Sequence, residues 1–83
     1  MDLIARSPQQ IGNALRRFRT ERSLRQADLG AMARLQQATV SKLEGGNPEA
    51  RLQTLADVLA ALDLELVIRP RTKADPADIE DLF

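Results

Sequence analysis

A run of short polar side chains between residues 36 and 42 carries the clearest chemical signal in the sequence. In a helix, Val40 and Leu43 would face a core, and the outward positions would be Gln36, Gln37, Ala38, Ser41 and Lys42. Glutamine can bond adenine N6 and N7 together, the alanine methyl can touch a thymine methyl, and serine and lysine can reach phosphates or base edges. The run therefore fits a helix that reads the major groove of DNA. The solvated polar face of an ordinary helical bundle would show the same pattern.

The composition excludes several other kinds of site. The 83 residues include no His, Cys, Trp or Tyr, which excludes disulfides, Cys/His metal sites and His or Cys nucleophiles, and argues against an aromatic platform for stacking bases. The sequence also lacks a glycine-rich phosphate loop, since Gly45-Gly46 is better interpreted as the end of a helix. We therefore expect a protein that works by binding, with no cofactor, no metal and no enzymatic activity.

The charges are unevenly distributed. The 12 basic and 12 acidic residues cancel overall. From residue 11 to 42, however, seven basic and two acidic residues give a net charge of +5, and from residue 74 to 83 four acidic residues give −4. A basic surface of this kind is expected of a DNA-binding domain. The alternative is that the first helix simply has a solvated face rich in arginine, formed by Arg16, Arg17, Arg19 and Arg22.

Capping and breaking signals predict four helices in one small domain. Ser7 as N-cap, Pro8 in the first turn and Gln10 three residues after the serine predict a helix that ends near Glu21. A second Ser-x-x-Gln pattern at 23–26 opens a helix of about 25–33, and a third helix of about 37–44 stops at two glycines and a proline. The second and third helices, with their short turn, form a helix-turn-helix candidate. A fourth helix, about 51–62, carries one apolar stripe: Leu52, Leu55, Ala56, Leu59 and Leu62.

The apolar period changes from helical to alternating after the fourth helix. Leu64, Leu66 and Ile68 alternate with other residues and predict a strand of about 64–69 that ends before Pro70. A lone strand leaves its backbone unpaired, so we expect it to pair across a homodimer. The alternative partner is the leader segment, residues 3–6, and one sheet could hold both pairings. The expected fold is therefore all-α, with four to five helices and this short C-terminal strand.

The expected domain boundaries follow from these elements. Residues 1–6 form an N-terminal leader, 7–69 the DNA-binding and dimerisation domain, and 70–83 an acidic tail that we expect to be disordered. The tail could be merely solvating, could fold back on the basic surface, or could bind a protein partner. Its candidate anchors for a partner are Ile79, Leu82 and Phe83. The sequence has no signal peptide and no membrane span, so a cytoplasmic location is expected.

The segment from Leu24 to Gly46 resembles the Xre/phage-repressor family of helix-turn-helix proteins. The matching positions are Gln26, Leu29, Thr39, Val40, Ser41, Glu44 and Gly46. Within that family the chain resembles the HipB-type antitoxins, through Ser7–Leu15, Gln37–Ser41, Asn47-Pro48, the alternating segment and the acidic tail.

The resemblance implies a dimeric repressor of its own operon that binds double-stranded operator DNA and neutralises a HipA-type Ser/Thr kinase toxin. It implies base contacts from Gln36, Gln37, Ala38 and Ser41. It also implies phosphate contacts from Gln26, Lys42, Arg34 and Thr39. The alternatives are a stand-alone Xre-type regulator without a toxin and a protein-interaction adaptor that does not bind DNA.

Two residues depart from the family pattern. Arg25 stands where a Thr or Ser usually caps the second helix, so Ser23 is a candidate cap one turn earlier. Arg34 stands where the turn usually has glycine. Either Arg34 is strained by a positive φ, or the turn differs and leaves the side chain available to reach a phosphate.

Overall fold

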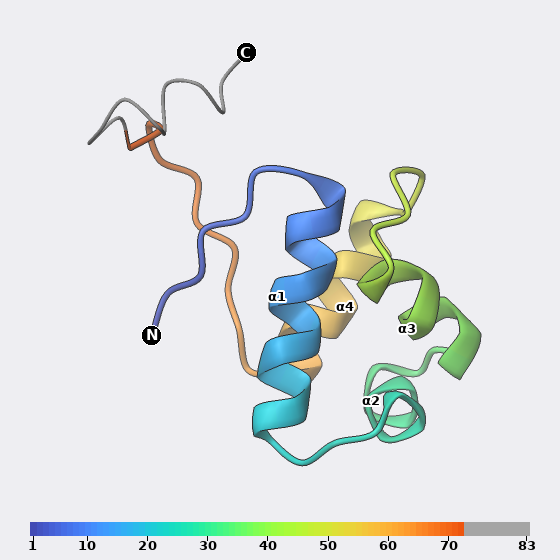
Figure 1. Ribbon diagram of the computed structural model, residues 1–83. Coiled ribbons are helices and arrows are strands. Elements are labelled where there is room, and N and C mark those ends of the chain that lie inside the picture. The colour runs from blue at the N-terminus through green and yellow to red at the C-terminus, as the bar shows by residue number, and fades with distance from the viewer. Residues whose placement is uncertain (73–83) are drawn as a thin grey trace.

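The computed structural model describes residues 1–72, so the predictions for Ile79, Leu82 and Phe83 lie outside the described residues. Within residues 1–72 the chain forms four helices: α1 (Pro8–Glu21), α2 (Gln26–Ala33), α3 (Gln37–Glu44) and α4 (Leu52–Ala61) (Figure 1). These bounds confirm the four-helix prediction, with α2 and α4 each slightly shorter than expected.

Helix α1 begins at the predicted capping site. The side-chain oxygen of Ser7 accepts a hydrogen bond from the backbone N–H of Gln10 at 3.1 Å, as an N-cap serine should. The Gln10 side chain accepts from the backbone N–H of Arg6 at 2.6 Å, one residue before the serine that a regular capping box would use. The leader is thereby tied to the first turn of α1.

One core joins all four helices. Its buried members are Leu15, Leu29, Val40, Leu43, Val58 and Leu62. The inward placement of Val40 and Leu43 was predicted from the period of α3. The stripe predicted for α4 was partly wrong, because Leu52 is 81% exposed and Ala56 is also exposed, whereas Val58 is buried. The inner face of α4 follows residues 55, 58, 59 and 62, and the first turn of the helix lies beyond the edge of the core.

Residues 64–69 do not form a strand within the described chain. Leu64 is half-buried against the core, whereas Leu66, Val67 and Ile68 are 65%, 68% and 92% exposed. The segment runs beside the leader on the side of the molecule away from α2 and α3 (Figure 1). Arg6 donates to the carbonyl of Thr72 at 3.2 Å, but among residues 1–72 no backbone ladder joins the leader to the segment. The alternative pairing with residues 3–6 is therefore wrong for the single chain.

Candidate nucleic-acid interface

The turn between α2 and α3 is built around a left-handed residue. Arg34 has φ 59° and ψ 42°. Of the two alternatives for this residue, the structure therefore confirms the positive φ that glycine would favour. The backbone N–H of Leu35 donates to the carbonyl of Gly30 at 2.7 Å. A Cβ on Gly30 would lie 2.8 Å from the carbonyl oxygen of Leu35, so glycine permits this close return of the chain.

The cap of α2 differs from the prediction. Ser23 has φ 57° and does not cap the helix, because Arg25 is the N-cap residue. The Asp28 carboxylate accepts from the backbone N–H of Arg25 at 2.8 Å and from its guanidinium at 3.1 Å. The guanidinium of Arg25, together with this backbone hydrogen bond, lowers the pKa of Asp28. A charged pair thus replaces the hydroxyl cap that the family pattern would supply.

The outward face of α3 presents the polar side chains predicted to contact bases. Gln36, Gln37, Ala38 and Ser41 are all exposed. Among the predicted phosphate contacts, Arg34 and Lys42 are exposed, whereas Gln26 and Thr39 are half-buried. The fold therefore brings both sets to the α2–α3 surface, because Val40 and Leu43 turn the opposite side of α3 into the core.

A network of charged and amide side chains underlies this surface. Arg19 and Glu44 form a bidentate ion pair with N–O distances of 2.6 and 2.9 Å, and their side chains are 10% and 4% exposed. Gln26 donates to the Glu44 carboxylate at 3.1 Å, and Gln37 donates to the Gln26 carbonyl at 2.6 Å. The network connects α1, α2 and both ends of α3.

Sequence reasoning misplaced Arg19 and gave Glu44 no role. Arg19 was assigned to the solvated arginine face of the first helix, but it is buried. Its hydrogen bonds to Glu44 raise the pKa of the guanidinium. The guanidinium also donates a hydrogen bond to the backbone carbonyl of Leu24 at 2.7 Å. The missed signal is that Arg19 lies four residues after Leu15, on the core face of α1.

Fewer of the seven basic residues between positions 11 and 42 are unpaired at the surface than their number in the sequence implied. Arg17 and Arg25 form surface ion pairs with Glu21 and Asp28, and Arg19 is paired in the interior. Three other cations are exposed around α3: Arg34 lies in the turn before it, Lys42 lies within it, and Arg51 lines a cavity together with Lys42.

Arg51 and Asn47 were also missed by sequence reasoning. They line a small cavity of about 190 Å³ between α3 and α4, together with Thr39 and Lys42. Two cations here flank the N-terminus of α4, where backbone N–H groups favour anions. The available signal was a basic residue, Arg51, at the predicted start of the fourth helix.

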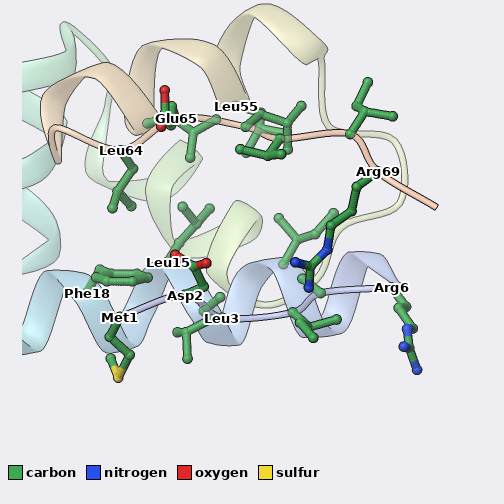
Figure 2. A pocket seen from close by; sticks show the side chains of 18 of the residues that line it. Met1, Asp2, Leu3, Arg6, Leu15, Phe18, Leu55, Leu64, Glu65 and Arg69 are labelled. Carbon is green, nitrogen blue, oxygen red and sulfur yellow. The ribbon is translucent and has the colours of Figure 1, made fainter. Parts of the chain in front are cut away.

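A second, larger cavity lies on the other side of the molecule, between the leader, α1, α4 and residues 63–72. Its volume is about 590 Å³. Leu55 and Leu64 line it opposite Leu15 and Phe18 of α1 (Figure 2). Of the residues predicted to mediate dimerisation, Leu64 therefore belongs to an apolar wall, and Leu66 and Ile68 are exposed beside it.

Residues 1–72 contain neither a metal-binding cluster nor a membrane-spanning helix. In that part of the chain no cluster of acidic residues could hold a metal ion. None of the four helices there is both long and apolar enough to cross a membrane.

Comparison with known proteins places the chain in a family. Residues 10–82 match the model of a helix-turn-helix domain family. The chain is 37% identical over 68 residues to an uncharacterized HTH-type transcriptional regulator, y4dL, of Sinorhizobium fredii. The matched region covers 82% of this chain but only 35% of that protein. The chain thus spans about a third of the length of that relative.

HipB proteins are similar over most of their length. The chain is 30% identical over 78 residues to antitoxin HipB of Escherichia coli O6:H1, covering 92% of this chain and 83% of that one. Its fold matches a HipB variant in a complex with an O2 20-mer, with a TM-score of 0.81, 26% identity and coverage of 87% and 100% of the two chains. It also matches a chain of a HipA-HipB-O2-O3 complex, with a TM-score of 0.75, 27% identity and coverage of 83% and 97%. The chain is therefore a member of the helix-turn-helix family and a relative of the HipB antitoxins.

Proposed function

We propose that this chain is the antitoxin of a type II toxin–antitoxin pair, acting as a dimeric, sequence-specific operator-binding repressor that also neutralises a HipA-type Ser/Thr kinase. The observation that carries the DNA-binding part is the exposed polar face of α3, supported from below by buried Glu44. In this proposal Gln36, Gln37, Ala38 and Ser41 contact bases. Gln26, Arg34, Thr39 and Lys42 contact phosphates, and Arg51 adds a phosphate contact at the start of α4.

The test of DNA binding separates positioning contacts from sequence-reading contacts. The affinity of the chain for its selected duplex should fall steeply as salt rises, because cationic side chains displace counterions from phosphates. Lys42→Ala should weaken binding to all duplexes similarly and reduce the salt dependence. Gln37→Ala should relax the preference at one base pair by about 1–3 kcal/mol. Affinity that does not change with salt would instead favour the adaptor hypothesis.

The dimer is proposed from the exposed apolar side chains beside the larger cavity. Leu64, Leu66 and Ile68 would pair with the same segment of a second copy, which would supply the backbone partners that a strand needs. A two-fold dimer would also match a palindromic operator. Analytical ultracentrifugation of the free protein tests this, since a monomer at micromolar concentration contradicts the proposed dimer.

The toxin-binding part of the proposal depends on likeness to HipB, one structure of which is a complex with HipA. Ile79, Leu82 and Phe83 are the proposed contacts. A chain truncated after Thr72 should lose affinity for a HipA-type kinase and no longer inhibit it. Undiminished binding and inhibition would remove the tail from this role.

A stand-alone regulator is the second candidate, because the relative with 37% identity is named as a transcriptional regulator. The absence of a kinase gene beside the gene for this chain would favour that alternative.

A further inference from the structure

The extended run of residues 64–70 leaves an apolar surface and a backbone edge uncovered. Leu66, Val67 and Ile68 are 65%, 68% and 92% exposed. Within the described part of the chain, no backbone hydrogen bond involves residues 65–71. An exposed apolar segment with open N–H and C=O groups can pair with another extended chain.

Glu65 and Arg69 place opposite charges on either side of this apolar centre. Both side chains are exposed, and no ion pair joins either of them to another residue of the described chain. Four positions along an extended chain span about 13 Å, so the two charges are far apart within one chain. In a second copy that runs in the opposite direction the order of the charges is reversed, and each carboxylate can meet a guanidinium. The run is therefore complementary to itself.

Two-fold symmetry restricts how the run can pair with its own copy. The axis stands perpendicular to the two strands, so the strands run antiparallel and each side chain keeps its face of the ribbon. Because side chains alternate between the faces of a strand, opposite residues are both even-numbered or both odd-numbered. A pairing that covers the apolar centre then has its axis at Leu66, Val67 or Ile68.

A register centred on Val67 satisfies both the charges and the apolar side chains. Glu65 then lies opposite Arg69 of the second copy, and Leu66 lies opposite its Ile68. With the axis at Leu66, Glu65 would lie opposite Val67. With the axis at Ile68, Arg69 would lie opposite Val67. Both alternatives set a charged group against an apolar side chain, so cross-strand complementarity favours the axis at Val67.

Pro70 fits the same register. It has no N–H to donate, and in this register it lies opposite Leu64. Opposite residues of an antiparallel pair alternate between hydrogen-bonded and non-hydrogen-bonded pairs, so the proline pair can be of the second kind. The pair of Leu66 and Ile68, two positions on, is then also of that kind, with Cα atoms about 4.5 Å apart and apolar side chains in contact. The intervening pairs, including Val67 with its copy, carry the backbone hydrogen bonds.

We infer that Glu65 and Arg69 are specificity-determining residues of this surface, which select a second copy of this chain as the partner and fix its register about Val67. The inference rests on the proposed function, in which this segment mediates dimerisation. Opposite charges directly across a strand pair stabilise it, and like charges destabilise it. In the single chain the Arg69 side chain extends over the larger cavity (Figure 2), so pairing requires it to turn to the face that carries Glu65.

Charge reversal tests the selection of the partner. Glu65→Arg sets an arginine opposite each Arg69, and Arg69→Glu sets a glutamate opposite each Glu65. Each variant should self-associate at least about tenfold more weakly than the wild type, because two attractive pairs become repulsive. An equimolar mixture of the two variants should dimerise as the wild type does, since every charge then faces its opposite. The double variant Glu65→Arg/Arg69→Glu should recover for the same reason.

The measurement is sedimentation of the full-length proteins over a dilution series, with circular dichroism to verify that each variant is folded. Glu49→Arg is the matched control, because it makes the same change of charge at an exposed position in the loop between α3 and α4. Its self-association should equal that of the wild type. Equal weakening by Glu49→Arg and Glu65→Arg would show an effect of net charge and overturn the pairing.

The absence of cysteine from the sequence allows the register to be mapped by disulfide cross-linking. Single cysteines are placed in turn along the run and oxidised. Only a residue on the axis has its own copy directly opposite, with Cα atoms about 5.5 Å apart, which a disulfide can bridge. Val67→Cys should therefore cross-link fastest, whereas Glu65→Cys and Arg69→Cys, each about 13 Å from its copy, should not cross-link. A mixture of Leu66→Cys and Ile68→Cys should form the mixed dimer in preference to either symmetric one.

The outcomes separate this inference from the proposed dimer. Unchanged self-association of Glu65→Arg and Arg69→Glu overturns the charge pairing while the dimer stands. Fastest cross-linking by Leu66→Cys or Ile68→Cys overturns the register. A wild type that is monomeric at micromolar concentration overturns the proposed dimer itself, and one that dimerises only after truncation at Thr72 assigns the run to the acidic segment of its own chain.

Discussion

Arg34 holds the α2–α3 turn in a conformation that favours glycine, with φ 59° and ψ 42°. A left-handed backbone costs a non-glycine residue about 1 kcal/mol. Arg34→Gly should therefore increase the free energy of unfolding by about 0.5–1 kcal/mol. The same change should weaken DNA binding, because it removes a proposed phosphate contact. Urea denaturation and a binding titration on one preparation test both effects.

Arg34→Ala is the matched control for that variant. Alanine removes the same charge but keeps the left-handed strain, so DNA affinity should fall as in Arg34→Gly without any gain in stability. If Arg34→Gly is no more stable than Arg34→Ala, the turn does not carry the expected strain. Equal DNA affinity in the wild type and both variants would exclude the phosphate contact.

The contribution of Asp28 to the stability of the fold, made at the start of α2, should depend on pH. Arg25 lowers the pKa of Asp28 below its usual value of 3.8. A carboxyl with a lowered folded-state pKa stabilises the fold fully above its unfolded pKa, and this contribution is lost as the pH falls through the folded pKa. Asp28→Asn keeps an oxygen for the cap and removes the charge. The variant should be less stable than the wild type at pH 7, and the difference should shrink below about pH 4.

The measurement is urea denaturation of both proteins at pH 7, 5, 4 and 3. A stability difference that is constant over the whole range would show that the charge of Asp28 contributes nothing. Because the pair is solvent-exposed, added salt should also reduce the difference.

At the scale of elements, α1 and the end of α3 approach so closely that only glycine fits at residue 12. A Cβ on Gly12 would overlap the carbonyl oxygen of Glu44 and lie 2.7 Å from that of Leu43. Both obstacles are backbone atoms, so Gly12→Ala must push the helices apart, at a cost of about 1–3 kcal/mol. Chemical denaturation would detect this loss.

Gly45→Ala is a suitable comparison, since it adds the same methyl group nearby with a much milder close contact. Its Cβ would lie 3.3 Å from the carbonyl oxygen of Ser41, and Gly45 has φ −76°. It should therefore change stability much less than Gly12→Ala. Similar losses in both variants would contradict the importance of the α1–α3 contact.

The elements themselves could largely be predicted, because their signals are local. Ser7, Pro8 and the Gly45-Gly46 pair mark helix ends within a few residues of where they act. The buried pair could not be predicted this way, since Arg19 and Glu44 are 25 positions apart. The hydrogen bond between Gln26 and Gln37 likewise spans 11 positions. The residues of the candidate interface were therefore predictable from their types, whereas the network beneath them depends on tertiary packing.

At the scale of the whole molecule, the zero net charge conceals an uneven division that has a measurable consequence. Residues 73–83 contain one basic and four acidic residues, so they contribute −3 and the remaining 72 residues carry +3. The acidic segment repels phosphates wherever it lies within a Debye length of the duplex, which is about 10 Å at 0.1 M salt. A chain truncated after Thr72 should therefore bind DNA more tightly than the full chain at low salt, by about a few-fold.

The salt dependence distinguishes this electrostatic effect from others. The advantage of the truncated chain should diminish as salt rises from about 50 to 300 mM, because screening weakens the repulsion. A full-length variant with Asp75, Asp78, Glu80 and Asp81 changed to the corresponding amides is the matched control, and it should reproduce the gain without shortening the chain. Equal affinities of the full and truncated chains at the lowest salt would contradict the prediction. A gain that persists at high salt would instead indicate that the segment competes with DNA for the α3 surface through non-ionic contacts.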